Sequence, residues 1–358
     1  MSFTILDSNK LAVANIKVIG VGGGGGNAVN RMIISGVKGV SFISANTDSD
    51  ALKKSLAVQK IQLGPKLTRG MGSGAHPDIG CHAAEESIPI IRQLLQGTDM
   101  LFITAGMGGG TGTGGAPVVA KVAKEMNILT IGVVTKPFMW EGEAKMTVAE
   151  EGIKKLGEYA DAVIEIANQR LFDLIDKDTP AEKIFGLPDD VLKCAVQSIS
   201  DIINKTGTIN VDFQDVKTIL KSSGKAILGF SEASGDDRVL QAIKKAVEHP
   251  LLNNQSIAGA KGVLVNITGS KDDLKMSEIG DVMETIHKET SPGARIIYGQ
   301  AFEDDLAGKI KITIIATGFT GIVEKAVDNS SQEEVNKEDL SIPAWMRKEK
   351  KSKRFWEG

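Results

Sequence analysis

The chain has 358 residues with 42 basic and 45 acidic side chains, and this near balance gives no reason to expect nucleic acid as a partner. Apolar residues make up 42% and aromatic residues only 4%, which predicts an aliphatic α/β core. The first residues lack a secretion signal and no apolar run is long enough to span a bilayer, so we expect a cytosolic protein.

Apolar runs bounded by glycine alternate with helical periodicity along the first half of the chain. The predicted strands are 16–20, 40–45, 100–104, 128–135 and 162–167, and the predicted helices are 27–35, 78–96, 114–126 and 142–157. This alternation is typical of a parallel sheet. A long helix over 191–204 follows, and then come strands at 226–230, 262–268, 295–302 and 310–317 with helices at 237–248 and 274–290.

The predicted fold class is α/β, with a Rossmann-like, largely parallel nucleotide-binding sheet, a long central helix and a second, smaller α/β domain with a mixed sheet. The C-terminal tail is expected to be disordered, because apolar content falls from Asp328 onward. The expected divisions are an N-terminal extension (1–12), a nucleotide-binding domain (13–187), a central helix and loop (188–224), a C-terminal domain (225–320), a linker (321–339) and a tail (340–358).

A first glycine run, GVGGGGGN from Gly20 to Asn27, lies between a predicted strand and a predicted helix. Glycines let a backbone approach a ligand and point its N–H groups at an anion. Gly20, Gly22 and Gly25 also satisfy GxGxxG, with Asp48 after the next strand where a dinucleotide fold places its ribose acid. This run alone leaves a dinucleotide site, a mononucleotide site and a tight turn open.

A second run, GGGTGTG from Gly108 to Gly114, also follows a strand and precedes a helix. Because parallel strands end on the same side of a sheet, both runs are expected to face one crevice, which suits a polyphosphate. Thr111 and Thr113 add hydroxyl groups to this run. A Walker loop is excluded, since no G-x-x-x-x-G-K-[ST] occurs.

GGGTGTG is the signature of tubulin-like proteins, and the sequence resembles the tubulin/FtsZ family of GTPases over residues 13–320 and again in the tail. The resemblance implies a polymerising GTPase of bacterial cell division that binds GTP or GDP with Mg²⁺ and assembles head to tail. It also implies assembly in the cytoplasm, at the inner face of the membrane at the division site.

The resemblance implies a nucleotide-binding residue for each matching position. The two glycine runs would hold the phosphates, Asn46 and Asp48 would lie near the phosphates and Mg²⁺, and GSGAHP would sense the terminal phosphate. These positions are Gly22, Gly23, Gly24, Gly25, Gly26, Asn27, Asn46, Asp48, Gly72, Gly74, Gly106, Gly108, Gly109, Gly110, Thr111, Gly112, Thr113 and Gly114.

The sensing segment departs from the family's commoner GAGGNP or GAGANP, with His76 where asparagine is usual. A second departure lies in the segment of Thr135, Pro137 and Glu141, in which the glutamate would contact the ribose. Lys145 stands where arginine is usual, and lysine lacks the planar fork of donors. Lys145 also has a plain interpretation, an i,i+4 pair with Glu141.

Three further positions match the family's base-binding residues. Asn168 would meet guanine, Phe185 would stack on the base, and Asp190 would accept hydrogen bonds from guanine N–H groups. Without the resemblance, Asp190 has an alternative interpretation as the N-cap of a helix that begins at Val191.

The catalytic prediction rests on Asn210, Asp212 and Asp215 in TGTINVDFQDV. Carboxylates three residues apart at a helix start can orient a water molecule or help hold a cation. The alternative is helix initiation, with Asp212 as cap and Asp215 complementing the dipole. In the resembling family this loop enters the nucleotide pocket of the next subunit, so polymerisation completes each active site.

The tail segment 340–348, LSIPAWMRK, resembles the family's docking peptide, with Ser341 where aspartate is usual. Ile342, Trp345 and Met346 would anchor in partners such as FtsA-like and ZipA-like membrane tethers. Two alternative functions remain open at this stage. One is a tubulin-like GTP-binding scaffold with little hydrolysis, and the other is a Rossmann NAD(P)-dependent oxidoreductase.

His76, Cys81 and His82 lack a fourth ligand, and no metal site is predicted from them.

Overall fold

The computed structural model describes residues 14–174, 179–204, 211–252, 257–303 and 306–319. In chain order the first half comprises β1 (Ile16–Val21), α1 (Gly22–Ile34), β2 (Ser41–Asn46), α2 (Ser49–Lys54), β3 (Gln59–Gln62), α3 (Pro77–Glu86), α4 (Ile88–Leu94), β4 (Met100–Gly106), α5 (Thr111–Glu125), β5 (Leu129–Lys136), η2 (Met139–Glu141), α6 (Glu143–Gly157), β6 (Ala162–Ala167) and η3 (Asn168–Leu174). The second half comprises α7 (Ala181–Asn204), α8 (Phe213–Leu220), β7 (Gly224–Ser234), α9 (Arg238–Val247), η4 (Pro250–Leu252), β8 (Gly262–Gly269), α10 (Met276–Glu289), β9 (Arg295–Phe302) and β10 (Lys309–Thr317).

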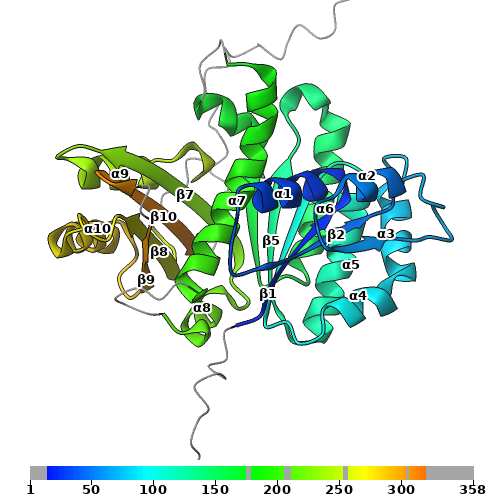
Figure 1. Ribbon diagram of the computed structural model, residues 1–358, viewed down its shortest axis with the longest axis horizontal. Coiled ribbons are helices and arrows are strands. Elements are labelled where there is room, and N and C mark those ends of the chain that lie inside the picture. The colour runs from blue at the N-terminus through cyan, green and yellow to red at the C-terminus, as the bar shows by residue number, and fades with distance from the viewer. Residues whose placement is uncertain (1–13, 175–178, 205–210, 253–256, 304–305, 320–358) are drawn as a thin grey trace, which may run out of the picture. The chain divides into compact units, whose positions relative to one another are not determined.

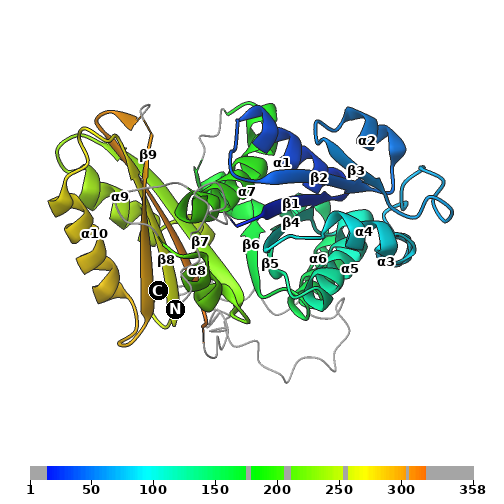
Figure 2. The same cartoon turned by 60° about the horizontal axis from the view of Figure 1, so that its bottom comes forward.

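These strands form one sheet in the order β3-β2-β1-β4-β5-β6-β7-β10-β8-β9 (Figures 1 and 2). Every pair from β3 to β6 is parallel, whereas β10 is antiparallel to both β7 and β8. The predicted α/β class, with a parallel first part and a mixed second part, is confirmed. The two parts meet through the short parallel pairing of β6 with β7, so they share one continuous sheet.

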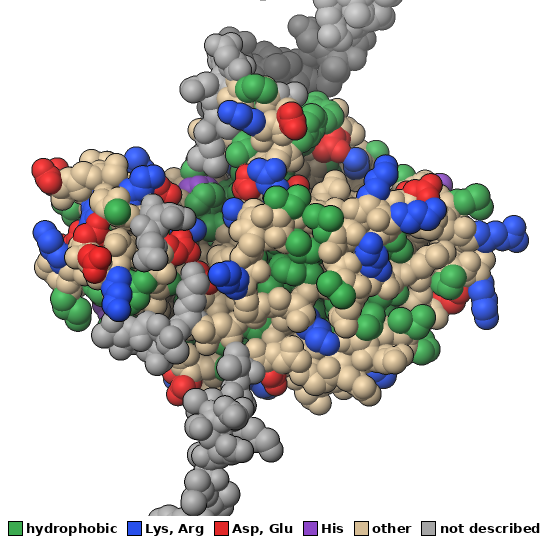
Figure 3. All heavy atoms as spheres, in the orientation of Figure 1, with side chains coloured by type: hydrophobic (Ala, Val, Ile, Leu, Met, Phe, Trp, Pro, Cys, Tyr) green, Lys and Arg blue, Asp and Glu red, His purple; other side chains and the backbone are tan. Residues whose placement is uncertain are grey.

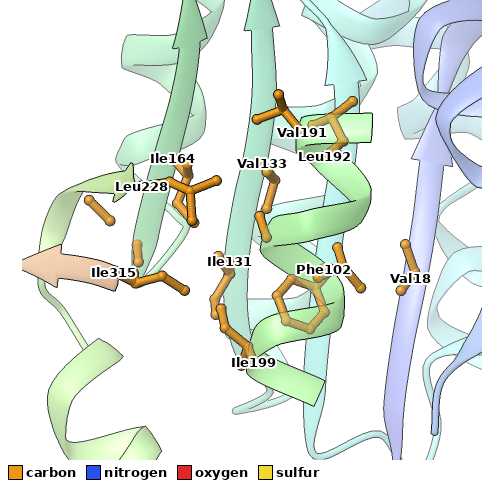
Figure 4. Close-up of a cluster of buried hydrophobic side chains, with 14 of the residues drawn as sticks. Val18, Phe102, Ile131, Val133, Ile164, Val191, Leu192, Ile199, Leu228 and Ile315 are labelled. Carbon is orange, nitrogen blue, oxygen red and sulfur yellow. The ribbon is translucent and has the colours of Figure 1, made fainter. Parts of the chain in front are cut away.

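The core is aliphatic and lies on both faces of the sheet. Helices α1 and α7 pack on one face of the central strands, α8 contacts β8 and β9 in the same core cluster, and α3 to α6 cover the other face of the first strands. In the second part, α9 and α10 cover β7, β8 and β10. Figure 4 shows how Val191, Leu192 and Ile199 of α7 pack against Phe102, Ile131 and neighbouring side chains of the sheet. The predicted central helix therefore joins the two parts of the molecule.

Three expectations about elements were wrong. Helix α7 begins at Ala181 rather than at 191. The prediction placed its start too late because Gly186 and Pro188, which normally break helices, lie inside it. The expected helix over 78–96 is two helices that meet at Ser87, with Pro89 in the first turn of the second. Helix α1 begins at Gly22, so most of the first glycine run is helical rather than a loop before a helix.

The surface mixes charges of both signs. On the face shown in Figure 3, acidic and basic side chains are interspersed, as the near balance of charges in the sequence predicts. No helix of the described ranges combines the length and apolar character that crossing a membrane requires.

Candidate nucleotide site

A cavity of about 350 Å³ opens where β1, β4, β5 and β6 end. Backbone and small polar side chains supply most of its walls. Its lining residues are Gly23, Gly24, Ser73, Gly106, Met107, Gly109, Gly110, Thr111, Gly112, Thr135, Pro137, Glu141, Lys145 and Asn168. All but Ser73 and Met107 are residues that the sequence resemblance singles out.

The two glycine runs meet in this cavity, as predicted. β1 and β4 are parallel neighbours, so the segments that follow them leave the sheet side by side. A Cβ on Gly24 would lie 3.2 Å from the Gly106 Cα, and a Cβ on Gly22 would lie 2.8 Å from the Gly112 nitrogen. The backbones are therefore too close for side chains, and their N–H groups and helix N-termini face a common space suited to an anion.

The glycines of the two runs have different tasks. A Cβ on Gly25 would lie 2.3 Å from the Thr104 carbonyl oxygen, and one on Gly114 would lie 2.0 Å from the Pro77 carbonyl oxygen. These two glycines serve helix packing. Gly23 and Gly109 line the cavity, and a Cβ on either would meet nothing within 4 Å. At these two positions the backbone is open to a ligand.

The order of strands gives the cavity a direction. Asn168 follows β6, Thr135 belongs to β5, and Gly106 ends β4. Gly23 and Gly24 follow β1, and Ser73 lies in the segment after β3, beyond β2 in the sheet. The cavity thus runs from an amide side chain at the β6 end to glycine amides and hydroxyl groups at the β1 end.

Lys145 and Glu141 form an ion pair at the cavity wall. The other carboxylate oxygen of Glu141 accepts a hydrogen bond of 2.8 Å from the Phe138 N–H. The expected i,i+4 pair is therefore present. The Lys145 stem also covers the second glycine run, because a Cβ on Gly108 would lie 2.8 Å from the Lys145 Cγ.

The β6 end of the cavity combines a buried amide with aromatic rings. Asn168 is buried, and its Oδ1 has no hydrogen-bond partner within the described part of the chain. Phe138 stacks on Trp140 with ring centroids 5.4 Å apart, and Phe185 lies edge-on to both rings. Phe185 and Trp140 are 57% and 64% exposed, so much of each side chain is open to solvent.

Asp190 is engaged by Arg31 of α1. The Arg31 guanidinium donates from Nε and Nη2 to the two oxygens of Asp190, both at 2.8 Å. The N-cap interpretation of Asp190 was wrong, because the residue lies well inside α7. Burial raises the pKa of the neighbouring Asp189 to about 6, against an opposing effect of Arg31.

The remaining predicted residues do not line the cavity. Asp48 caps α2 by accepting hydrogen bonds from the N–H groups of Asp50 and Ala51, and Asn46 accepts one from the Asp48 N–H. Thr113 accepts a hydrogen bond of 2.9 Å from the Gly108 N–H. The others outside the lining are Gly22, Gly25, Gly26, Asn27, Gly72, Gly74, Gly108, Gly114, Phe185 and Asp190.

Sequence reasoning missed several residues of this region. Ser73 and Met107 line the cavity, and both stand next to glycines that were singled out. Arg31 carried no signal, since a single arginine on a helix is ordinary. Trp140 lies between Pro137 and Glu141 in a segment that the resemblance singles out. An aromatic residue there could have been predicted to contribute to the site.

Asp212 and Asp215 lie at the start of α8 and are exposed. Asp212 is in the N-cap position, but its side chain makes no capping hydrogen bond, which weakens the helix-initiation alternative. Helix α7 precedes α8 in the chain, and its 24 residues rise about 36 Å. Figure 1 shows α8 at the opposite end of α7 from the cavity edge of the sheet. Asn210 and the segment 340–348, with Ser341, lie outside the described residues.

Comparison with known proteins assigns this arrangement to a family. Residues 15–176 match the family model described as "Tubulin/FtsZ family, GTPase domain", and residues 224–320 match "FtsZ family, C-terminal domain". A Cell division protein FtsZ from Coxiella burnetii is 45% identical over 349 residues, covering 95% of this chain and 90% of that protein. The chain belongs to the tubulin/FtsZ family.

Other relatives agree with this assignment. A Cell division protein FtsZ from Caulobacter vibrioides is 48% identical over 306 residues, which is 86% of this chain. The matched part spans 60% of that relative's length. An FtsZ dimer of M. jannaschii superposes with a TM-score of 0.81 at 38% identity, covering 87% of this chain and 90% of that one. The tubulin/FtsZ fold thus extends across both parts of the sheet.

Proposed function

We propose that the protein is a GTPase that polymerises head to tail into the filaments of the bacterial division ring. One observation carries this proposal. The cavity walls offer amides and hydroxyls for phosphates, whereas the exposed carboxylates of Asp212 and Asp215 lie at the far end of α7. A head-to-tail contact between subunits would bring these two halves together.

GTP would lie along the cavity with its base at the β6 end. The unpartnered Oδ1 of Asn168 and the carboxylate of Asp190 are hydrogen-bond acceptors, which suit the N–H groups of guanine. Phe185 would stack on the base, and Glu141 lies where the ribose would follow. The amides from Gly23 to Gly24 and from Gly109 to Gly112 would then hold the phosphates.

Mg²⁺ fits the residues at the end of β2. Asp48 uses Oδ1 to accept the two amides of α2, and Oδ2 accepts no hydrogen bond in the described ranges. Mg²⁺ is commonly held by one or two carboxylates together with substrate phosphates, so Asp48 with Asn46 is a suitable donor set. When bound, the ion neutralises charge on the phosphates.

Hydrolysis would require the next subunit. Phosphoryl transfer depends mainly on positioning and charge stabilisation, and the glycine amides supply both for the phosphates. Asp212 and Asp215 of the incoming subunit would orient the attacking water, aided by Asn210. Among the described residues that line the cavity, Glu141 is the only carboxylate, and it is already paired with Lys145.

The tail would connect filaments to the membrane. Residues 340–348 carry apolar side chains followed by Arg347 and Lys348, a pattern suited to a partner groove with an acidic rim. We infer that FtsA-like or ZipA-like tethers bind there and hold filaments at the inner face of the membrane. The protein itself would then act in the cytoplasm.

Phosphate release from GTP, measured against protein concentration, tests the shared site. Specific activity should be near zero at high dilution and rise above a threshold concentration. Constant specific activity would contradict a site shared between subunits. Absence of turnover at every concentration, with GTP still bound, would favour a scaffold with little hydrolysis.

A further inference from the structure

Asp161 joins the parallel part of the sheet to the turn that follows α8. It directly precedes β6, and its Oδ2 accepts a hydrogen bond of 2.9 Å from the Thr130 N–H of β5. Its Oδ1 accepts one of 3.2 Å from the Ser222 N–H, just after the end of α8. The Asp161 carbonyl accepts a further one of 2.9 Å from the Gly224 N–H at the start of β7. One residue thus connects β5, β6 and the end of α8.

The turn after α8 has a backbone conformation that needs support. Ser222 has a φ of 53°, in the left-handed region that residues other than glycine rarely adopt. A left-handed residue at this place closes the end of a helix, and the Ser223 N–H completes the turn by donating to the Leu220 carbonyl at 3.3 Å. Such a conformation persists where the surrounding structure holds it, and here Asp161 accepts two N–H groups of the turn.

The carboxylates of Asp212 and Asp215 depend on α8 for their position. Both residues are exposed, and neither carboxylate has a hydrogen bond or ion pair with another residue of the described ranges. The buried face of α8 consists of Val216, Ile219 and Leu220. Apolar burial is non-directional, so directional hydrogen bonds at the helix end fix how α8 is oriented. Because α8 has only 8 residues, a shift at its end reaches both carboxylates.

A second attachment holds the end of α8 from the other part of the molecule. The Thr317 hydroxyl of β10 lies 3.3 Å from the Ile219 carbonyl and 3.3 Å from the Gly262 carbonyl, so its single proton is shared between them. The bond from Ser222 goes to a carboxylate instead, and hydrogen bonds to an ionised group are roughly twice as strong as neutral ones. Asp161 is therefore the stronger directional attachment of this helix end.

Asp161 lies far from the cavity of its own subunit. It comes just before the start of β6, whereas Asn168, which lines the cavity, comes just after the end of that strand. The 6 residues of β6 rise about 20 Å. Asp161 is thus too distant to contact a nucleotide in the same subunit.

We propose that Asp161 is a positioning residue for hydrolysis, which fixes α8 and thereby places Asp212 and Asp215 for the cavity of the next subunit. The inference rests on the proposed function, because it takes these two carboxylates as the groups that orient the attacking water. A displacement of about 1 Å can lower a catalytic rate about a hundredfold, so a slight loosening of α8 is sufficient.

The test measures GTP affinity and phosphate release separately, with release expressed per subunit that sediments as polymer. Asp161→Ala should lower release about tenfold or more, because α8 loses its attachment to the parallel sheet. GTP affinity should stay within about twofold, because the nucleotide would lie at the opposite end of β6. Asp161→Asn, which keeps one acceptor oxygen, should lose less activity.

Asp99→Ala is the matched control. Asp99 directly precedes β4 as Asp161 precedes β6, and its Oδ2 accepts a hydrogen bond of 2.8 Å from the Asn15 N–H. That bond holds the start of β1 rather than α8. The control variant should therefore lose stability and keep both its GTP affinity and its release per polymerised subunit.

Mixing variants shows which half of the shared site Asp161 serves. Gly109→Asp damages the cavity and leaves α8 intact, so an equal mixture with Asp161→Ala should recover to about a quarter of wild-type release, the share of interfaces with both halves intact. An equal mixture with Asp212→Ala should stay at the mean of its components, because both changes affect α8. Recovery with Asp212→Ala would place the effect of Asp161 in its own cavity and overturn the inference.

Unchanged release per polymerised subunit in Asp161→Ala also overturns the inference. If that variant does not fold, unchanged release in Asp161→Asn decides against it in the same way. Failure of the wild-type protein to show release that depends on its concentration would instead refute the proposed function, so the two failures are distinguishable.

Discussion

Arg31 and Asp190 join α1 to α7 through two parallel hydrogen bonds, both of 2.8 Å. The guanidinium lies flat against Gly186, because a Cβ there would be 3.2 to 3.3 Å from its Nη1, Cζ and Nη2 atoms. Gly186 is therefore tolerated inside a helix because the arginine occupies its side-chain space. The pair connects the helix that starts at the glycine run with the helix that carries the proposed base-binding carboxylate.

Arg31→Ala should weaken GTP binding about tenfold, because Asp190 loses the partner that fixes its orientation. Stability should change by about 1 kcal/mol or less, since both side chains are more than a third exposed. Equilibrium nucleotide binding and urea unfolding measure the two effects. Arg92→Ala removes a pair of similar exposure, with Glu125, and should leave GTP affinity unchanged. Equal affinities for the two variants would contradict a positioning role for Arg31.

Two glycines in the first run should respond oppositely to alanine. Gly25→Ala forces a Cβ against the Thr104 carbonyl oxygen, so the melting temperature should fall by several degrees or more. Gly23→Ala meets open space and replaces a helical glycine, so stability should hold or rise by up to about 1 kcal/mol. Its nucleotide affinity should fall, because Gly23 lines the cavity. Calorimetric melting and nucleotide titration check both results, and unaltered GTP binding by Gly23→Ala would argue against phosphates at this run.

Mixing two inactive variants tests whether neighbouring subunits share the active site. Asp212→Ala should bind GTP without turnover, and Gly109→Asp should repel phosphates while keeping its own Asp212. In a head-to-tail copolymer of equal parts, about a quarter of the interfaces would combine an intact cavity with an intact Asp212. Phosphate release should therefore recover on mixing. A mixture as inactive as its components would place Asp212 in a role within its own subunit.

His249 should make stability depend on pH. It is buried against Phe230, with ring centroids 4.4 Å apart, and its Nδ1 accepts a hydrogen bond from the Leu251 N–H. Burial lowers the pKa of His249 to about 4, from 6.5. The unfolded chain therefore takes up a proton first as pH falls, and the free energy of unfolding should drop by up to about 3 kcal/mol between pH 6.5 and 4.

Urea unfolding at several pH values measures this dependence. His249→Gln should flatten the decline, whereas His82→Gln should not, because His82 is exposed. The same slope in wild type and His249→Gln would show that other groups cause it.

Local patterns predicted much of the fold because they act over short stretches of chain. Glycine-bounded apolar runs marked most of the parallel strands, and the two glycine runs were expected to meet because parallel strands end on one side of a sheet. β3 and α2 were not predicted, since 49–62 is short and polar. The start of α7 was missed because Gly186 and Pro188 read locally as helix breakers, while the packing of Arg31 and of the core stabilises the helix across them.

The sequence by itself determined the glycine runs, the carboxylates of α8 and the family to which they point. Only the tertiary structure decided which glycines face the cavity and which pack helices, because that depends on the backbone that lies opposite each one. It also decided the partners of polar groups far apart in the chain, Arg31 with Asp190 and Ser73 with Thr111 and Thr47. Such pairs carry no sequence period, since folding alone brings their segments within hydrogen-bond distance.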